Sequence, residues 1–277
     1  MSKKIYPNFL FVGPGKTGSK WLTKVFHNHP NIFVPKIDMY FFDRDENFSR
    51  GIKWYKKFFE KKKASHKAVG ELSHDYINSE LAAKRIHRYN QKMKIIINLR
   101  NPIDLCYSTY LGEKNAGWTT LPFSEELIHN SILLNRGMYS EKINFYYKYF
   151  SKDDILVLKY DDLVNDKEKF LETIFKFLEV RNIKELANIP PYNTARLPRL
   201  KFLGRFAKKT GMFLRKNNFI TLFTLLRNNS LIKKLLYVKN KNSVLSFADK
   251  KELSNKFTED IKKTEKITGL NLKNWYY

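Results

Sequence analysis

Two short segments of the sequence carry residue types that bind phosphate. The first, residues 13–19, reads Gly-Pro-Gly-Lys-Thr-Gly-Ser and follows the apolar run 8–12. A helical pattern begins directly after it, so backbone N–H groups at the helix start would face an anion. Lys16 would add a full positive charge, and Thr17 and Ser19 hydroxyl donors. The second segment begins at Arg100, directly after the isoleucine-rich run 94–99. The first segment predicts a phosphorylated ligand, and the second places a cationic side chain at the end of another strand.

The first loop differs from that of nucleoside triphosphatases. The Walker A order G-x-x-x-x-G-K-[S/T] is absent, because Lys16 precedes Gly18. The sequence also lacks a clear strand-end aspartate for Mg²⁺. A nucleoside triphosphatase is therefore disfavoured. A P-loop-like nucleotide kinase is kept as an alternative, which magnesium-dependent ATP turnover would favour.

The elements around these segments predict an α/β fold. Strands are expected at 8–12, 32–34, 68–72, 94–99 and 155–160, and helices after residue 19 and at 52–63, 79–89, 104–111, 141–150, 166–178 and 248–268. Their alternation indicates a mostly parallel central sheet flanked by helices. Ligands bind such sheets at the carboxyl ends of the strands, where both phosphate segments lie.

The length of 277 residues, of which 43% are hydrophobic, suits one large domain spanning 1–277. Residues 196–242 are basic with short apolar clusters, and we predict helices and no strand there. Packing within the fold, a lid, an acceptor groove and a membrane-surface helix all remain open for 206–237. The single cysteine, Cys106, indicates a reducing compartment. Because signal-peptide and membrane-span patterns are lacking, we expect a cytoplasmic protein.

The formal net charge of +25 suits an anionic partner, but lysine used as a default surface residue also explains it, and we favour this second explanation. Residues 54–63 mix aromatic and lysine side chains, which suits stacking on nucleic acid. A helix with an aromatic inner face and a lysine outer face explains the same pattern, and we favour it. A basic nucleic-acid-binding protein, with steep salt dependence, is the second alternative. It leaves both phosphate segments unexplained, so we expect no nucleic acid partner.

Together the motifs resemble those of sulfotransferases that use 3′-phosphoadenylyl sulfate (PAPS), closest to the bacterial and heparan-sulfate type. Residues 16–22 resemble the family's 5′-phosphosulfate loop, Lys-x-Gly-Thr/Ser-x-x-Leu, and Arg100-Asn-Pro followed by Ser108 resembles its 3′-phosphate element. Residues 29–35, 70–76, 160–163 and 245–275 also resemble family segments, so the likeness covers most of the chain. It implies a P-loop-NTPase-like fold with a helical C-terminal part. It also implies a set of donor-binding residues, namely Lys16, Thr17, Gly18, Ser19, Lys20, Trp21, Arg100 and Ser108, with Arg199 or Lys201 closing over the 3′-phosphate.

The resemblance implies sulfuryl transfer from PAPS to a hydroxyl or amine of a glycan or small metabolite, leaving adenosine 3′,5′-bisphosphate (PAP). Lys16 would stabilise the charge that develops on the leaving phosphate. Residues 36–43 resemble the family's Lys-Glu-Pro-x-Phe-Phe stretch, whose Glu is the catalytic base, and the aligned residue here is Asp38. We therefore predict Asp38 as the base, although its side chain is one methylene shorter. We expect no metal, because cationic side chains can neutralise the donor and no acidic or histidine cluster has ligand spacing.

Two departures from the family pattern concern the acceptor side. His74 stands where the family has Pro, and a histidine there is a rival base. Leu72 replaces a Lys of some relatives, so acceptor contacts would differ. His27 and His29, at the end of the first helix, are expected to be a cap and a surface residue. Neither the oligomeric state nor the identity of the acceptor can be inferred from the sequence.

Overall fold

The computed structural model describes residues 6–191, 196–198, 237–239 and 245–276. The chain divides into two compact units. The first comprises Met1–Asn101, Met138–Tyr192 and Glu259–Trp275, and the second comprises Pro102–Gly137, Asn193–Thr258 and the last two residues. The single domain expected from the length stays a prediction.

A five-stranded parallel sheet in the order β2-β3-β1-β4-β5 forms the centre of the first unit. Its strands are β2 (Ile32–Phe33), β3 (Ala68–Leu72), β1 (Phe9–Gly13), β4 (Lys94–Leu99) and β5 (Ile155–Lys159). Strands β1 and β3 are buried along their whole length, as expected where helices cover both faces of a parallel sheet. The predicted fold class is confirmed.

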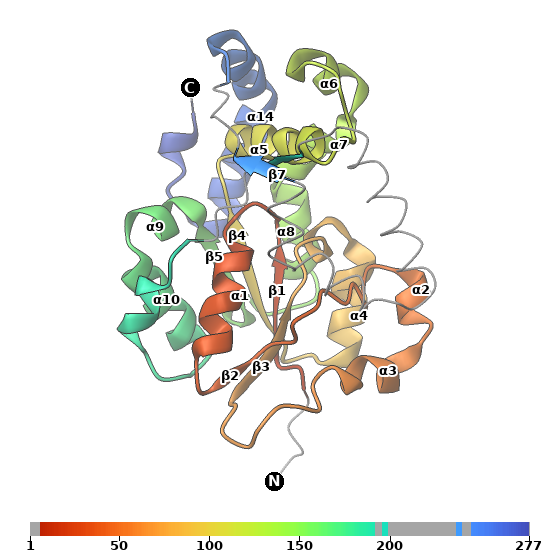
Figure 1. Ribbon diagram of the computed structural model, residues 1–277, viewed down its shortest axis with the longest axis vertical. Helices are drawn as coiled ribbons and strands as arrows, with labels where there is room; N and C mark the ends of the chain where they lie inside the picture. The colour runs from red at the N-terminus through yellow and green to blue at the C-terminus, as the bar shows by residue number, and fades with distance from the viewer. Residues whose placement is uncertain (1–5, 192–195, 199–236, 240–244, 277) are drawn as a thin grey trace. The chain divides into compact units, whose positions relative to one another are not determined.

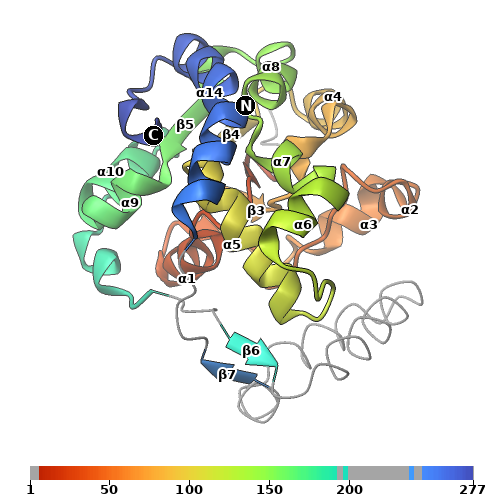
Figure 2. The same ribbon diagram turned by 90° about the horizontal axis from the view of Figure 1, so that it is seen from above.

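Helices cover both faces of this sheet (Figures 1 and 2). On one side lie α1 (Ser19–Asn28), α9 (Tyr160–Asn165) and α10 (Lys167–Phe177), and on the other α4 (Glu80–Tyr89) and α8 (Ser140–Tyr147). The remaining elements of the first unit are α2 (Asp45–Phe48), α3 (Gly51–Lys57) and the short 3₁₀ helices η1 (Tyr76–Asn78), η2 (Lys152–Asp154), η3 (Lys184–Asn188) and η4 (Lys273–Trp275). The core between α1, α10 and the sheet includes Phe9 and Phe26, whose rings meet edge to face at 5.6 Å.

Helix α3 has the aromatic inner face that the sequence suggested. Tyr55 and Phe59 are buried, and Tyr55 stacks on Phe41 with ring centroids 4.4 Å apart, whereas Lys56 and Lys57 are exposed. The helix ends at Lys57, so the predicted extent to residue 63 was too long. Turns continue from there to residue 61 because backbone hydrogen bonds of the 3₁₀ spacing replace the α-helical ones.

The second unit contains α5 (Pro102–Asn115), α6 (Phe123–His129), α7 (Ser131–Gly137) and the first part of α14 (Phe247–Thr268). A side chain at Gly137 would lie 2.8 Å from the Phe257 ring and 2.9 Å from Pro102, so this glycine allows three helices to pack closely. In the part of the chain that the structure describes, no helix combines the length and the hydrophobicity of a membrane span.

One expectation about residues 196–242 is wrong. The sequence predicted no strand there, but β6 (Arg196–Pro198) and β7 (Tyr237–Lys239) pair in antiparallel register. The two strands are short and far apart in the sequence, so no local alternation or turn signal marks them as a pair. The residues between them, which include the proposed lid or acceptor groove, lie outside the described part.

Candidate active site

Four neighbouring strands of the first unit deliver the candidate residues at their carboxyl ends. In the spatial order β3, β1, β4, β5, the strands are followed by His74, the phosphate loop 13–18, Arg100 and Tyr160. All four strands are parallel, so these segments lie at one edge of the sheet. This is the edge at which open parallel sheets bind ligands.

The phosphate loop has a backbone that only glycine adopts easily at two positions. Gly13 and Gly18 have φ angles of 119° and 88°, and Lys16, with φ 66°, is also left-handed. A Cβ on Gly13 would lie 2.3 Å from the His74 carbonyl oxygen, and one on Gly18 would lie 2.6 Å from Leu163. Gly18 is the N-cap of α1, so the loop leads directly into a helix start that favours anions.

Two buried polar side chains stabilise the loop. The Thr17 hydroxyl donates to the Pro14 carbonyl at 2.7 Å, and the Asn98 amide, from β4, donates to the Thr17 carbonyl at 2.8 Å. We predicted the Thr17 hydroxyl as a phosphate donor. In this structure it donates within the loop, so its observed role is to shape the loop.

The structure brings Lys16 and Arg100 together. Arg100 Nη1 donates to the Lys16 carbonyl at 3.1 Å, and its guanidinium carbon lies 5.0 Å from the centre of the Tyr160 ring. The Arg100 carbonyl accepts a hydrogen bond of 2.6 Å from the Tyr139 hydroxyl, which fixes the end of β4. The side chain of Arg100 therefore contacts the backbone of the phosphate loop directly.

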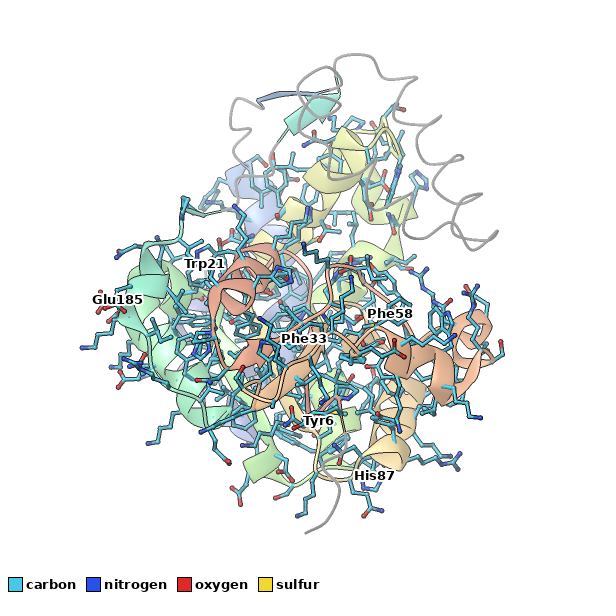
Figure 3. All side chains as sticks on the ribbon, turned by 60° about the horizontal axis from the view of Figure 1, so that its bottom comes forward. Tyr6, Trp21, Phe33, Phe58, His87 and Glu185 are labelled. Carbon is cyan, nitrogen blue, oxygen red and sulfur yellow. The ribbon has the colours of Figure 1, made fainter. Side chains whose placement is uncertain are left out.

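The other residues predicted to bind the nucleotide donor differ in their burial and in the unit to which they belong. Ser19 and Lys20 begin α1, with Lys20 exposed. Trp21 is buried, and its indole N–H donates to the Ile189 carbonyl at 2.8 Å. Figure 3 shows Trp21 beside the segment that carries Glu185, so its side chain belongs to the core. Ser108 lies on α5 in the second unit, and Arg199 and Lys201 lie outside the described residues.

The predicted base, Asp38, is half-buried in the segment between β2 and α2. It does not cap the next helix, because Arg44 is the N-cap of α2. Asp38 lies within electrostatic range of Glu71, at the end of β3. Burial raises the Glu71 pKa to about 7, opposed by hydrogen bonds from Ser73, Tyr55 and Tyr76, and the Asp38 charge raises it further.

Asp43 is a candidate that our reading of the sequence did not single out. Burial raises its pKa to about 6 although Arg44 acts in the opposite direction, and the charges of Asp75 and Glu46 add to the rise. Its Oδ1 atom is buried without a hydrogen-bond partner in the part of the chain that is described. A carboxyl with a pKa near 6 is suited to accept a proton near neutral pH. The sequence signal for Asp43 was an acidic residue directly after the aromatic pair Phe41-Phe42, which the structure shows to be buried.

His74 lies between the phosphate loop and the segment that carries Asp38. Its Cδ2 atom is 3.1 Å from where a Cβ on Gly15 would be, and its ring meets the Tyr40 ring edge to face at 6.0 Å. Its Nε2 atom is 3.8 Å from Asp75 Oδ2, and its side chain is 34% exposed. This position is compatible with the rival role of base.

The other two histidines of interest have structural contacts. His29 is the buried C-cap of α1, and its Nε2 atom lies 2.8 Å from the Arg181 carbonyl oxygen. His27 is exposed overall, and its ring contacts the Val34 carbonyl at 3.1 Å. Burial lowers the pKa of both imidazoles, so neither is favoured as a cation. One of the two histidines is thus a cap and the other a surface residue, with His29 as the cap and His27 at the surface.

Residues 7–191 match the model of the sulfotransferase domain family, and the chain belongs to this family. The resemblance seen in the motifs is thereby confirmed. Human heparan sulfate glucosamine 3-O-sulfotransferase 5 is 26% identical over 197 residues, covering 67% of this chain and 54% of that protein. The bifunctional heparan sulfate N-deacetylase/N-sulfotransferase 1 of Xenopus laevis is 30% identical over 199 residues, covering 64% of this chain and 22% of that protein. The chain thus spans about half the length of the first relative.

The fold is also that of a solved sulfotransferase. The enzyme from Alicyclobacillus acidocaldarius superposes with a TM-score of 0.70 at 20% identity, covering 98% of this chain and 99% of that one. Among the described residues, no His, Cys, Asp or Glu cluster could hold a metal ion. Metal-independent transfer stays a prediction.

Proposed function

We propose that this protein transfers a sulfuryl group from PAPS to a hydroxyl or amine of a glycan or small metabolite, releasing PAP. The observation that supports this most is the contact between Arg100 Nη1 and the Lys16 carbonyl, 3.1 Å. It joins the ends of two neighbouring strands into one cationic site beside a helix start. The missing Walker A order argues against the kinase alternative.

The described residues fit the anionic groups of such a donor. The loop around Lys16 and the N-terminus of α1 would hold the 5′-phosphosulfate, and Arg100 would hold the 3′-phosphate. Stacking on Tyr160 and the bond to the loop hold the guanidinium in place. Ser108 and one of Arg199 and Lys201 are proposed as further 3′-phosphate contacts from the resemblance alone.

In the proposed reaction, the bond between sulfur and the phosphate oxygen breaks as the acceptor oxygen or nitrogen bonds to sulfur. The Lys16 ammonium would stabilise the negative charge that grows on the phosphate oxygen, which lowers the barrier more than it strengthens ground-state binding. Asp38 would take the acceptor proton. Its proximity to the end of β3 supports this role, and His74 and Asp43 are the competing bases.

The acceptor class is proposed from the relatives. Their names specify heparan sulfate and glucosamine, which carry both hydroxyl and amine groups. A glucosamine-containing glycan is therefore the first acceptor to test. The cytoplasmic location is also proposed, and the single cysteine, which suits a reducing compartment, supports it.

Calorimetric titration with PAP tests the donor site without any acceptor. Lys16→Ala and Arg100→Ala are each expected to weaken PAP binding about 10- to 100-fold, because each removes a charge-assisted phosphate contact. Lys92→Ala and Arg88→Ala are matched controls, since both residues are exposed and lie away from the carboxyl ends of the strands. Wild-type protein that does not bind PAP, or equal affinity in all four variants, would refute the site.

Transfer itself is tested with [³⁵S]PAPS and two acceptors, N-desulfated heparan sulfate and chitosan oligosaccharides. Label is expected in at least one of these glucosamine polymers and is expected to be lost with Lys16→Ala. Magnesium-dependent ATP turnover without transfer of label would favour the kinase alternative instead.

A further inference from the structure

A single buried carboxyl, Glu71, connects the two halves of the proposed site. Glu71 is 1% exposed and is the last residue but one of β3. Three hydroxyl groups donate to it: Tyr55 to Oε2 at 2.7 Å, and Ser73 and Tyr76 to Oε1 at 2.5 and 2.9 Å. A buried carboxyl normally requires hydrogen-bond donors of this kind. Two of the donors, Ser73 and Tyr76, also bond to other segments of the chain.

The Tyr76 hydroxyl uses its full hydrogen-bonding capacity. A phenol has one proton to donate and two lone pairs to accept with. Its proton goes to Glu71, and its oxygen accepts from the backbone N–H groups of Phe41 at 2.8 Å and Phe42 at 3.3 Å. Because the Tyr76 hydroxyl donates its hydrogen bond to the Glu71 carboxylate, both lone pairs of the hydroxyl oxygen accept from this backbone. Glu71 thus orients Tyr76, and Tyr76 holds residues 41–42.

Residues 41–42 belong to the segment that carries the proposed base. Asp38 precedes Phe41 by three residues, and Asp43 directly follows Phe42. The Asn47 amide holds the same segment from the other side, donating to the Met39 carbonyl at 2.9 Å. The base segment is therefore fixed by buried polar contacts and not by packing alone.

Ser73 connects the same carboxyl to the donor side. Its hydroxyl donates to Glu71, and its backbone N–H donates at 2.9 Å to the carbonyl of Phe11 on β1, the strand that leads into the phosphate loop. The next residue, His74, packs against Gly13 and Gly15 of that loop. Glu71 is thus bonded to Tyr76, which holds the base segment, and to Ser73, which directly precedes the residue packed against the donor loop.

We propose that Glu71 and Tyr76 are positioning residues, which set the base segment 38–43 relative to the donor loop. This inference rests on the proposed function. A displacement of about 1 Å at a reacting group can reduce turnover about 100-fold. Loss of this pair should therefore lower turnover while donor binding, which depends on Lys16 and Arg100, is unchanged.

Tyr76→Phe and Tyr55→Phe form a matched pair that separates positioning from general stability. Both residues are fully buried, and both donate one hydroxyl to Glu71. Only the Tyr76 hydroxyl also accepts from the base segment. Tyr55→Phe removes one hydrogen bond to Glu71, whereas Tyr76→Phe removes one such bond and also releases residues 41–42.

Two measurements decide the proposal. Hydrogen exchange in the peptide covering 38–43 should become about 5- to 10-fold faster in Tyr76→Phe than in Tyr55→Phe, with exchange in 94–99 equal in both. Turnover with [³⁵S]PAPS and the better glucosamine polymer should fall about 10- to 100-fold in Tyr76→Phe and about threefold or less in Tyr55→Phe, with equal affinity for PAP. Glu71→Gln should behave like Tyr76→Phe, because its amide N–H groups oppose the hydroxyl donors.

Equal exchange or equal turnover in the two tyrosine variants would overturn the proposal. A failure of the proposed function would look different, because wild-type protein would then not bind PAP. The exchange measurement needs no substrate, so it tests the positioning contact in either case.

Discussion

Replacing Glu71 by Gln should change how the stability of the protein depends on pH. Burial raises the pKa of this carboxyl from 4.5 to about 7 in the folded protein. Between these two values the folded state therefore binds more protons at Glu71 than the unfolded state does. The free energy of unfolding then falls as pH rises through this window, because the buried carboxyl must ionise.

The size of the effect follows from the shift. One pKa unit corresponds to about 1.4 kcal/mol, so a rise from 4.5 to about 7 amounts to about 3 kcal/mol over the whole window. Between pH 5 and pH 8, about 2 to 3 kcal/mol of this loss should be measurable. Glutamine does not titrate, so the variant should lack this part of the pH dependence, although it will be less stable overall at low pH.

Urea denaturation at pH 5, 6, 7 and 8 provides the assay, followed by tryptophan fluorescence. The slope of stability against pH is compared between wild type and Glu71→Gln, so contributions from other groups, including Asp43, cancel. Glu80→Gln is the control, because hydrogen bonding from Lys148 lowers the pKa of that carboxyl and its titration falls below this pH range. If wild type and Glu71→Gln lose the same stability from pH 5 to pH 8, the reasoning about the buried carboxyl is wrong.

Two further substitutions test the chemistry and the loop. Asp38→Asn should lower kcat about 10²- to 10⁴-fold with PAP affinity unchanged, as expected for a general base; near-normal turnover in the [³⁵S]PAPS assay would transfer that role to His74 or Asp43. Gly18→Ala should lower the free energy of unfolding by about 2 to 4 kcal/mol, because φ is 88° and the new methyl would lie 2.6 Å from Leu163. Gly51→Ala, with φ 77° and nothing within 4 Å, should show only the backbone cost of about 1 to 2 kcal/mol in urea denaturation, and equal losses would contradict the packing argument.

The sheet and the donor side could be predicted because their signals are local. An apolar run such as residues 94–99, followed at once by Arg100, identifies both a buried strand and the position of a functional residue at its end. The rule that parallel strands present ligands at their carboxyl ends then placed Lys16 and Arg100 near each other. The strand order places β1 beside β4, and the contact between Arg100 and the Lys16 carbonyl follows from that order.

The acceptor side could not be predicted in the same way, because its contacts join residues distant in sequence. Tyr76 bonds to the backbone at Phe41, and Tyr55 bonds to Glu71, and neither pairing has a periodic or spacing signal. The helices α6 and α7 were missed for a related reason. Their sequences 123–129 and 131–137 are short, and each gains its apolar contacts from α5 and not from a long amphipathic repeat of its own.

The division of charge between the two sides of the site has a mechanistic consequence. The donor side presents Lys16 and Arg100 at the ends of β1 and β4, which suits a ligand that gains negative charge during transfer. The proposed acceptor side contains Asp38 and Asp43, and the buried Glu71 lies within electrostatic range of Asp38, which suits a group that must lose a proton. Burial raises the pKa of Asp43 and of Glu71, so these two carboxyls retain protons closer to neutral pH than exposed carboxyls do. In the proposed site the cationic donor side and the acidic acceptor side are therefore separate, so phosphate binding and proton removal occur at adjacent places without the two sets of charges cancelling. This separation depends on Glu71, which holds the segment that carries Asp38 and Asp43.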